Sequence, residues 1–140
     1  MTIYIAVVGG ADCNNDQYKF GYEVGVEIAN KGGVVVCGGG SGVMEAVAKG
    51  AFDAGGVSIG ILPGNKHHEA NQFISYAVAT GFGEARNAII TRTADVMIAI
   101  GGEYGTLSEV ALALKMGKKV IALGSWVFRA PGLEIDPLIR

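Results

Sequence analysis

Two glycine-rich stretches carry residue types that could bind phosphate. GGGSG occupies residues 38–42, and GGEYGTLSE occupies residues 101–109; each lies between an apolar run and a segment with helical periodicity. Glycines let the backbone approach a ligand closely, and the free N–H groups at a helix start attract anions. The stretches therefore predict phosphate contacts at Gly39, Gly40, Ser41, Gly42, Gly101, Gly102, Gly105 and Thr106.

A second interpretation of the first stretch needs no ligand. Three successive glycines can form a tight turn, with Ser41 or Gly42 as the cap of the following helix. The stretch matches neither the P-loop, since no GK[ST] follows, nor the GxGxxG fingerprint of dinucleotide-binding proteins. Three glycines in a row exceed what a turn requires, which favours phosphate contact.

Glu109 is the candidate acid of the second stretch. Beside a phosphate cradle, its carboxyl group could serve as a catalytic acid. Thr106-x-x-Glu109 also matches a capping box, in which the carboxylate accepts a hydrogen bond from the N–H of the cap residue. Such a cap would contribute about 1 kcal/mol without any ligand. The residues alone leave both roles open.

Arg86 and Asn87 lie in GFGEARNAII, near the start of a predicted helix. A positive charge in the first turn opposes the helix dipole, so helix stability does not explain Arg86. Its guanidinium could clamp a phosphate or a carboxylate in bidentate fashion. The alternative is a surface salt bridge with Glu84 or Glu103, which would contribute little to stability.

The elements that must position these residues alternate between strand and helix. Short, β-branched apolar runs bounded by glycine predict strands over residues 3–8, 34–37, 57–62, 95–100 and 119–123, with an ambiguous segment at 73–81. Helical periodicity covers residues 17–30, 43–54, 84–93 and 107–116. Residues 125–140 show no clear period, so we expect them to be irregular.

This alternation predicts a single α/β domain over residues 1–140. The expected architecture is doubly wound and Rossmann-like, with a mostly parallel sheet and helices on both faces. In such folds ligands bind outside the carboxyl ends of the strands, where the glycines concentrate here. Gly9 and Gly10, after the first strand, and Asn71, in the segment after the third, therefore join the predicted binding rim.

Composition excludes several classes of function. The chain has 140 residues, and its 11 Lys and Arg face 13 Asp and Glu, so it lacks the basic stripe typical of nucleic-acid binding. Apolar runs stay far below the roughly 20 residues that span a bilayer, and no leader opens the chain, so we expect a cytoplasmic protein. Cys13 and Cys37 match no metal spacing and are predicted to be free thiols.

Several motifs in a fixed order resemble one superfamily. They are GGGSGVMEAVAKGA, ILPG, TGFGEARNAII and ADVMIAIGGEYGTLSEVALALKMGKKVIAL. In this order they are similar to the LOG-like (SLOG) Rossmann superfamily, and most closely to its short bacterial proteins similar to the molybdenum-cofactor carrier protein. The resemblance implies a homo-oligomer, dimer or tetramer, that binds a nucleotide or a molybdenum cofactor as its ligand, with no other cofactor or metal required.

The best-known members of the superfamily are phosphoribohydrolases, which cleave the N-glycosidic bond of nucleoside 5′-monophosphates. Their Arg and Glu fall on Arg86 and Glu109, so the resemblance implies these two as catalytic residues of an enzyme. Two departures favour a carrier: Ile100 replaces the proline of the hydrolase motif, and Asn87 replaces the Lys of its Arg-Lys pair. Some relatives are labelled lysine decarboxylases, but no motif here surrounds a Lys that would hold pyridoxal phosphate.

Overall fold

The structure is a computed structural model that describes residues 1–126 and 138–140. The strands are β1 (Tyr4–Gly9), β2 (Val34–Cys37), β3 (Val57–Leu62), β4 (Tyr76–Ala79), β5 (Val96–Ile100) and β6 (Val120–Leu123). The α-helices are α1 (Asn15–Asn30), α2 (Val43–Asp53), α3 (Arg86–Thr93) and α4 (Tyr104–Lys115), and short 3₁₀ helices form at His67–Glu69 and Gly83–Ala85. Within the described residues, no helix is both long and apolar enough to cross a membrane.

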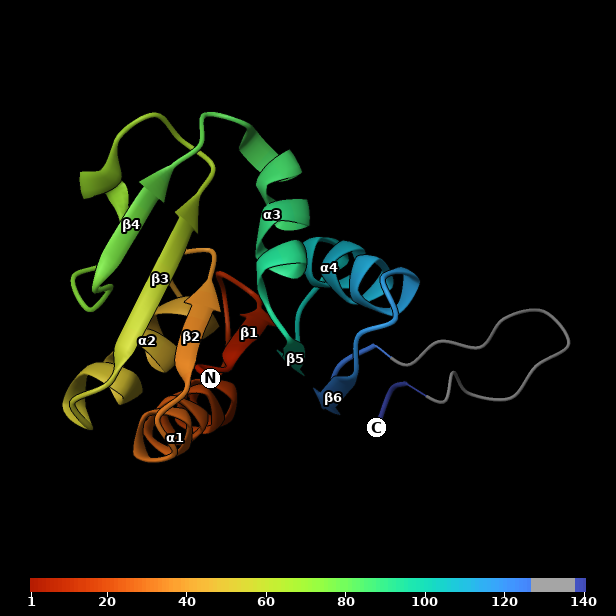
Figure 1. Ribbon diagram of the computed structural model, residues 1–140, viewed down its shortest axis with the longest axis horizontal. Coiled ribbons are helices and arrows are strands. Elements are labelled where there is room, and N and C mark those ends of the chain that lie inside the picture. The colour runs from red at the N-terminus through yellow and green to blue at the C-terminus, as the bar shows by residue number, and fades with distance from the viewer. Residues whose placement is uncertain (127–137) are drawn as a thin grey trace, which may run out of the picture.

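The strands form one parallel sheet in the order β4-β3-β2-β1-β5-β6. The chain builds β2, β3 and β4 on one side of β1 and then crosses to the other side for β5 and β6 (Figure 1). The predicted doubly wound α/β class is therefore confirmed. The strand order reverses between β1 and β5, and their carboxyl ends are where such sheets bind ligands.

Two hydrophobic cores lie on opposite faces of the sheet. Successive residues of a strand point to opposite faces, so Val7 and Val8 belong to different cores. Val7 packs in a buried cluster with Ile28 of α1. Val8 packs in another with Ile90 of α3 and Val110 of α4. Figure 1 shows α1 and α2 side by side, apart from α3 and α4. Each helix pair thus covers one face.

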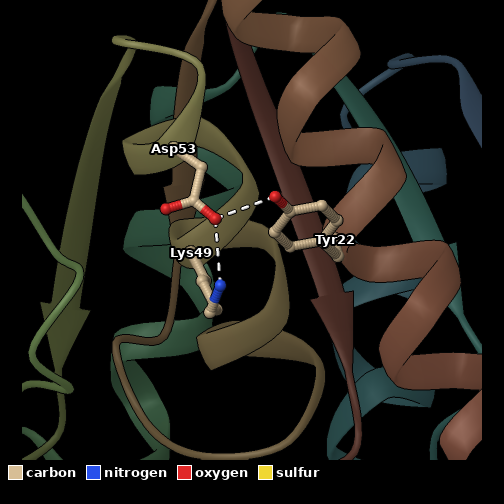
Figure 2. A network of polar contacts seen from close by, with 3 residues as sticks. All are labelled: Tyr22, Lys49 and Asp53. Carbon is tan, nitrogen blue, oxygen red and sulfur yellow. Dashed lines mark hydrogen bonds and ion pairs between the residues drawn. The ribbon is translucent and has the colours of Figure 1, made fainter.

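Helices α1 and α2 approach each other closely. A Cβ atom added to Gly50 would lie 2.0 Å from the Tyr22 carbonyl oxygen, so only glycine fits at this crossing. At the surface, the Tyr22 hydroxyl donates a hydrogen bond of 2.8 Å to Asp53 Oδ2, and Lys49 Nζ lies 2.9 Å from the same oxygen (Figure 2). These contacts join the two helices that cover one face of the sheet.

Three segments differ from the sequence prediction or complete it. Helix α4 begins at Tyr104, three residues before the predicted start. The ambiguous segment 73–81 contains β4. The end of the chain is not wholly irregular, because the Val120 N–H donates to the Leu138 carbonyl at 2.8 Å and Ile139 forms a parallel bridge with Val120. Residues 127–137 lie outside the described part of the chain.

Candidate functional site

A pocket of about 370 Å³ opens at the carboxyl ends of β1, β2, β3 and β5. Predicted site residues from three separate segments line it: Gly9, Gly10, Arg86, Asn87, Gly105, Thr106 and Glu109. The position matches the reversal of strand order beside β1, where α/β sheets bind their ligands. The volume is within the range of small-molecule sites.

The N-terminus of α4 lies uncapped at this pocket. Glu103 is the N-cap residue, and its side chain accepts no capping hydrogen bond. The Leu107 N–H donates to the Glu103 carbonyl at 2.9 Å, so the N–H groups of Tyr104, Gly105 and Thr106 precede the first helical hydrogen bond. None of these three N–H groups has an acceptor in the described part of the chain. The helix therefore presents free donors and its positive dipole end to the pocket.

The capping-box interpretation of Thr106 and Glu109 is wrong. Thr106 is the third residue of α4 rather than its cap, because the helix begins earlier than the apolar pattern indicates. Glu109 is 6% exposed and lines the pocket. Its carboxylate therefore faces a ligand-sized space and not the backbone of the first turn.

Arg86 begins α3 and lies over the end of β2. A Cβ atom on Gly38 would lie 2.8 Å from Arg86 Nη2, so the glycine makes room for the guanidinium. Arg86 Nη1 donates to Asn87 Oδ1, and Nε is buried without an acceptor among the described residues. The expected alternative, an ion pair with Glu84 or Glu103, does not form in that part of the chain.

Asn87 holds Arg86 in place. Its side chain is 7% exposed, and Nδ2 donates to Ser108 Oγ at 3.2 Å. Ser108 Oγ in turn donates to the Gly105 carbonyl at 2.7 Å. This chain of hydrogen bonds ties the start of α3 to the first turn of α4. Asn87, whose Oδ1 accepts a hydrogen bond from Arg86, thus orients the guanidinium.

Glu109 is a buried carboxyl group inside the pocket. Burial raises its pKa from 4.5 to about 7, and the nearby Arg86 guanidinium opposes part of this rise. Nevertheless, Arg86 and Glu109 form no ion pair within the described residues. The carboxyl group can therefore take up or release a proton near neutral pH, which is the property of a general acid or base.

The other predicted glycines and Asn71 lie outside the lining of this pocket. Asn71 Nδ2 donates to the Gly40 carbonyl at 2.8 Å, and Ser41 Oγ donates to the Ala11 carbonyl at 3.1 Å. Gly42 is the N-cap of α2. These contacts hold the GGGSG loop against its neighbours. Phosphate contact stays a prediction for the residues outside the pocket, which are Gly39, Gly40, Ser41, Gly42, Asn71, Gly101 and Gly102.

Sequence reasoning missed part of the lining. Asp12, Met44 and Glu84 line the pocket but lie outside the predicted rim segments. Asp12 follows Gly10 by two residues, so its place in the turn after the first strand was the sequence feature that could have predicted it as a pocket residue. Glu84 precedes Arg86 by two residues. The exposed carboxylates of Asp12, Glu84 and Glu103 make the mouth of the pocket acidic.

The described residues indicate neither a metal site nor a disulfide. Within the described residues, no group of three or more His, Cys, Asp or Glu could hold a metal ion. Cys13 and Cys37 are free, as predicted. Burial raises the pKa of the Cys37 thiol to about 11, which leaves it protonated and unreactive.

Known proteins are similar to this chain in sequence and in fold. An uncharacterized protein of Archaeoglobus fulgidus is 46% identical over 134 residues, which cover 91% of this chain and 88% of the relative. The molybdenum cofactor binding protein of Rippkaea orientalis is 43% identical, with a TM-score of 0.85 over 87% of this chain and 76% of its own. The molybdenum cofactor carrier protein of Chlamydomonas reinhardtii is 38% identical, with a TM-score of 0.81 over 90% and 78%.

One family accounts for nearly the whole sequence. The sequence profile of the SLOG cluster4 family matches residues 2–135, which include β1 to β6, α1 to α4 and all the pocket residues described above. The resemblance inferred from the glycine motifs is therefore confirmed. This chain belongs to the SLOG cluster4 family.

Proposed function

We propose that this protein binds a phosphorylated heterocycle, a nucleotide or a molybdopterin-type cofactor, and acts as a carrier. The observation that carries the proposal is the uncapped start of α4. Gly105 and Thr106, whose N–H groups are free, line one pocket together with Arg86. Together they supply the dipole, the directed donors and the full positive charge that a phosphate monoester requires.

The relatives support the same class of ligand. The proteins from Rippkaea orientalis and Chlamydomonas reinhardtii are named for binding or carrying the molybdenum cofactor. The fit of such a ligand here rests on this chain's own atoms, because the buried Nε of Arg86 lacks an acceptor among the described residues. A bound anion would satisfy the guanidinium. The α4 N–H groups and Arg86 would then hold the phosphate, while the pocket encloses the ring.

Thermal stability tests the proposal directly. AMP, GMP and a pterin monophosphate are each expected to raise the melting temperature, because a ligand that binds only the folded state stabilises it. Inorganic phosphate at the same concentration serves as the control for the anion alone. No shift with any compound of this panel would contradict the proposal. Native mass spectrometry of the purified protein would reveal a retained ligand and also test the expected homo-oligomer.

Arg86→Ala is expected to weaken phosphate-ligand binding by about tenfold to a hundredfold. The change removes a charge-assisted contact of about 1.5–3 kcal/mol. Arg92→Ala is the matched control, since Arg92 is an exposed arginine of the same helix outside the pocket lining. Isothermal titration with GMP measures both variants. Equal losses in the two would show that only overall charge matters and that Arg86 is not a ligand contact.

A second candidate function rests on Glu109. A buried carboxyl group with a pKa of about 7, in the same pocket as Arg86, has the property of the general base of a phosphoribohydrolase. Glu109 would accept a proton from water as the water oxygen bonds to the anomeric carbon. The C–N bond would break with its electron pair going to the ring nitrogen, which takes up a proton and leaves as the free base. Asn87, where the hydrolases carry Lys, argues for the carrier.

Release of free base distinguishes the two functions. We expect no release by the parent protein from adenosine, guanosine, inosine or cytidine monophosphate, while binding is retained. Chromatography of the reaction mixtures detects the free base. Release that disappears in Glu109→Gln would establish the hydrolase and overturn the carrier.

A further inference from the structure

Glu109 is a buried carboxyl group that lines the pocket and has no hydrogen-bond partner among the described residues. Its side chain is 6% exposed, and its carboxylate has neither a hydrogen bond nor an ion pair within the described residues. A buried carboxylate is normally paired, because removing it from water is costly. Arg86, the cation that opposes the rise in the Glu109 pKa, donates to Asn87 and forms no ion pair with Glu109 within the described residues. A hydrogen-bond donor on a ligand would supply the partner that the described residues do not provide for Glu109.

The position of Glu109 relates that partner to the phosphate end of the ligand. Gly105 and Glu109 are four residues apart on α4, and both line the pocket, so they share one face of the helix. A ligand whose phosphate lies at the start of α4 thus presents another part of itself to Glu109.

The chemistry of a carboxylate limits what that part can be. An ionised carboxylate only accepts hydrogen bonds, and its two oxygens match two parallel N–H donors, as they do with arginine. Guanine and pterin rings share a 2-amino-4-oxopyrimidine edge, which presents a ring N–H beside an exocyclic amino group. Adenine and cytosine present an amino group beside a ring acceptor, and hypoxanthine has the ring N–H without the amino group.

We propose that Glu109 selects ligands with a 2-amino-4-oxopyrimidine edge, guanine or pterin, by accepting hydrogen bonds from the ring N–H and the exocyclic amino group. This inference rests on the proposed function and names its ligand class. The exposed carboxylates of Asp12, Glu84 and Glu103 add to the negative potential at the pocket, which favours a donor edge.

A comparison of GMP with IMP isolates the exocyclic amino group, the one group by which these nucleotides differ. Isothermal titration at about pH 8, where the Glu109 carboxylate prevails, should give the parent protein at least about tenfold higher affinity for GMP than for IMP. Glu109→Gln keeps the size of the side chain but replaces one acceptor with a donor, so the GMP to IMP ratio should fall toward one. Glu23→Gln, at an exposed residue of α1 outside the pocket lining, should keep the parental ratio.

The outcomes separate this inference from the function on which it rests. If GMP, IMP and AMP all bind with equal affinity, the proposed function stands and the role of Glu109 in selection is overturned. The same follows if the GMP to IMP ratio survives in Glu109→Gln. If none of these nucleotides nor a pterin monophosphate binds, the proposed function fails together with this inference. The parental ratio needs no variant, so a misfolded variant leaves the test intact.

Discussion

Glu109→Gln is expected to gain stability over the parent protein as the pH rises, by about 3 kcal/mol between about pH 4.5 and pH 8.5. The pKa of Glu109 is raised from 4.5 to about 7 by burial, with Arg86 opposing the rise. A raised pKa means that the folded state holds its proton more tightly than the unfolded chain. The resulting stabilisation is full below about pH 4.5 and is lost as the pH rises through about 7.

Glutamine does not ionise, so the variant escapes this loss at high pH. Chemical denaturation of both proteins at several pH values gives the difference in the free energy of unfolding. Glu103→Gln is the control, because its side chain is exposed and both forms remain in water. A difference for Glu109→Gln that is constant over this pH range would show that the carboxyl group is not buried as described. Arg86, the charged group that acts on Glu109, is present in both the parent and the Glu109→Gln variant, so the comparison isolates the carboxyl group.

Gly50→Ala is expected to lower the free energy of unfolding by about 2–3 kcal/mol. The added Cβ would lie 2.0 Å from the Tyr22 carbonyl oxygen and 3.0 Å from the Val26 nitrogen, both backbone atoms of α1. Because the backbone cannot rotate away as a side chain does, α1 and α2 would have to separate. That strain outweighs the gain of about 1 kcal/mol that alanine normally brings to a helix.

A second glycine on a helix provides the control for this change. Gly105, in the first turn of α4, has nothing within 4 Å of an added Cβ. Gly105→Ala should therefore leave the stability unchanged or raise it slightly. Chemical denaturation of both variants measures the contrast. Equal stabilities would mean that the two helices cross with more space than the structure shows.

The local pattern of the sequence was sufficient for the elements. Residues 34–37 and 57–62 form strands with the predicted bounds, because a short β-branched run closed by glycine suits a strand buried on both faces. The start of α4 was less accurate. Apolar periodicity begins at Leu107, whereas the helix begins at Tyr104, since glycine and exposed residues of a first turn carry no hydrophobic signal. Because the helix begins at Tyr104, Thr106 lies within its first turn and is not its N-cap.

The positions of the glycine turns at strand ends also came from the sequence, since parallel strands place their carboxyl ends at one edge. The sequence by itself determined the fold class, the edge that holds the pocket and the candidates Arg86, Gly105 and Glu109. Only the tertiary structure decided that β1 lies beside β5, that Asn71 closes the GGGSG loop, and that Glu109 is buried without a partner among the described residues. Strand order, loop closure and burial depend on residues far apart along the chain, whereas periodicity and turn chemistry depend on neighbours.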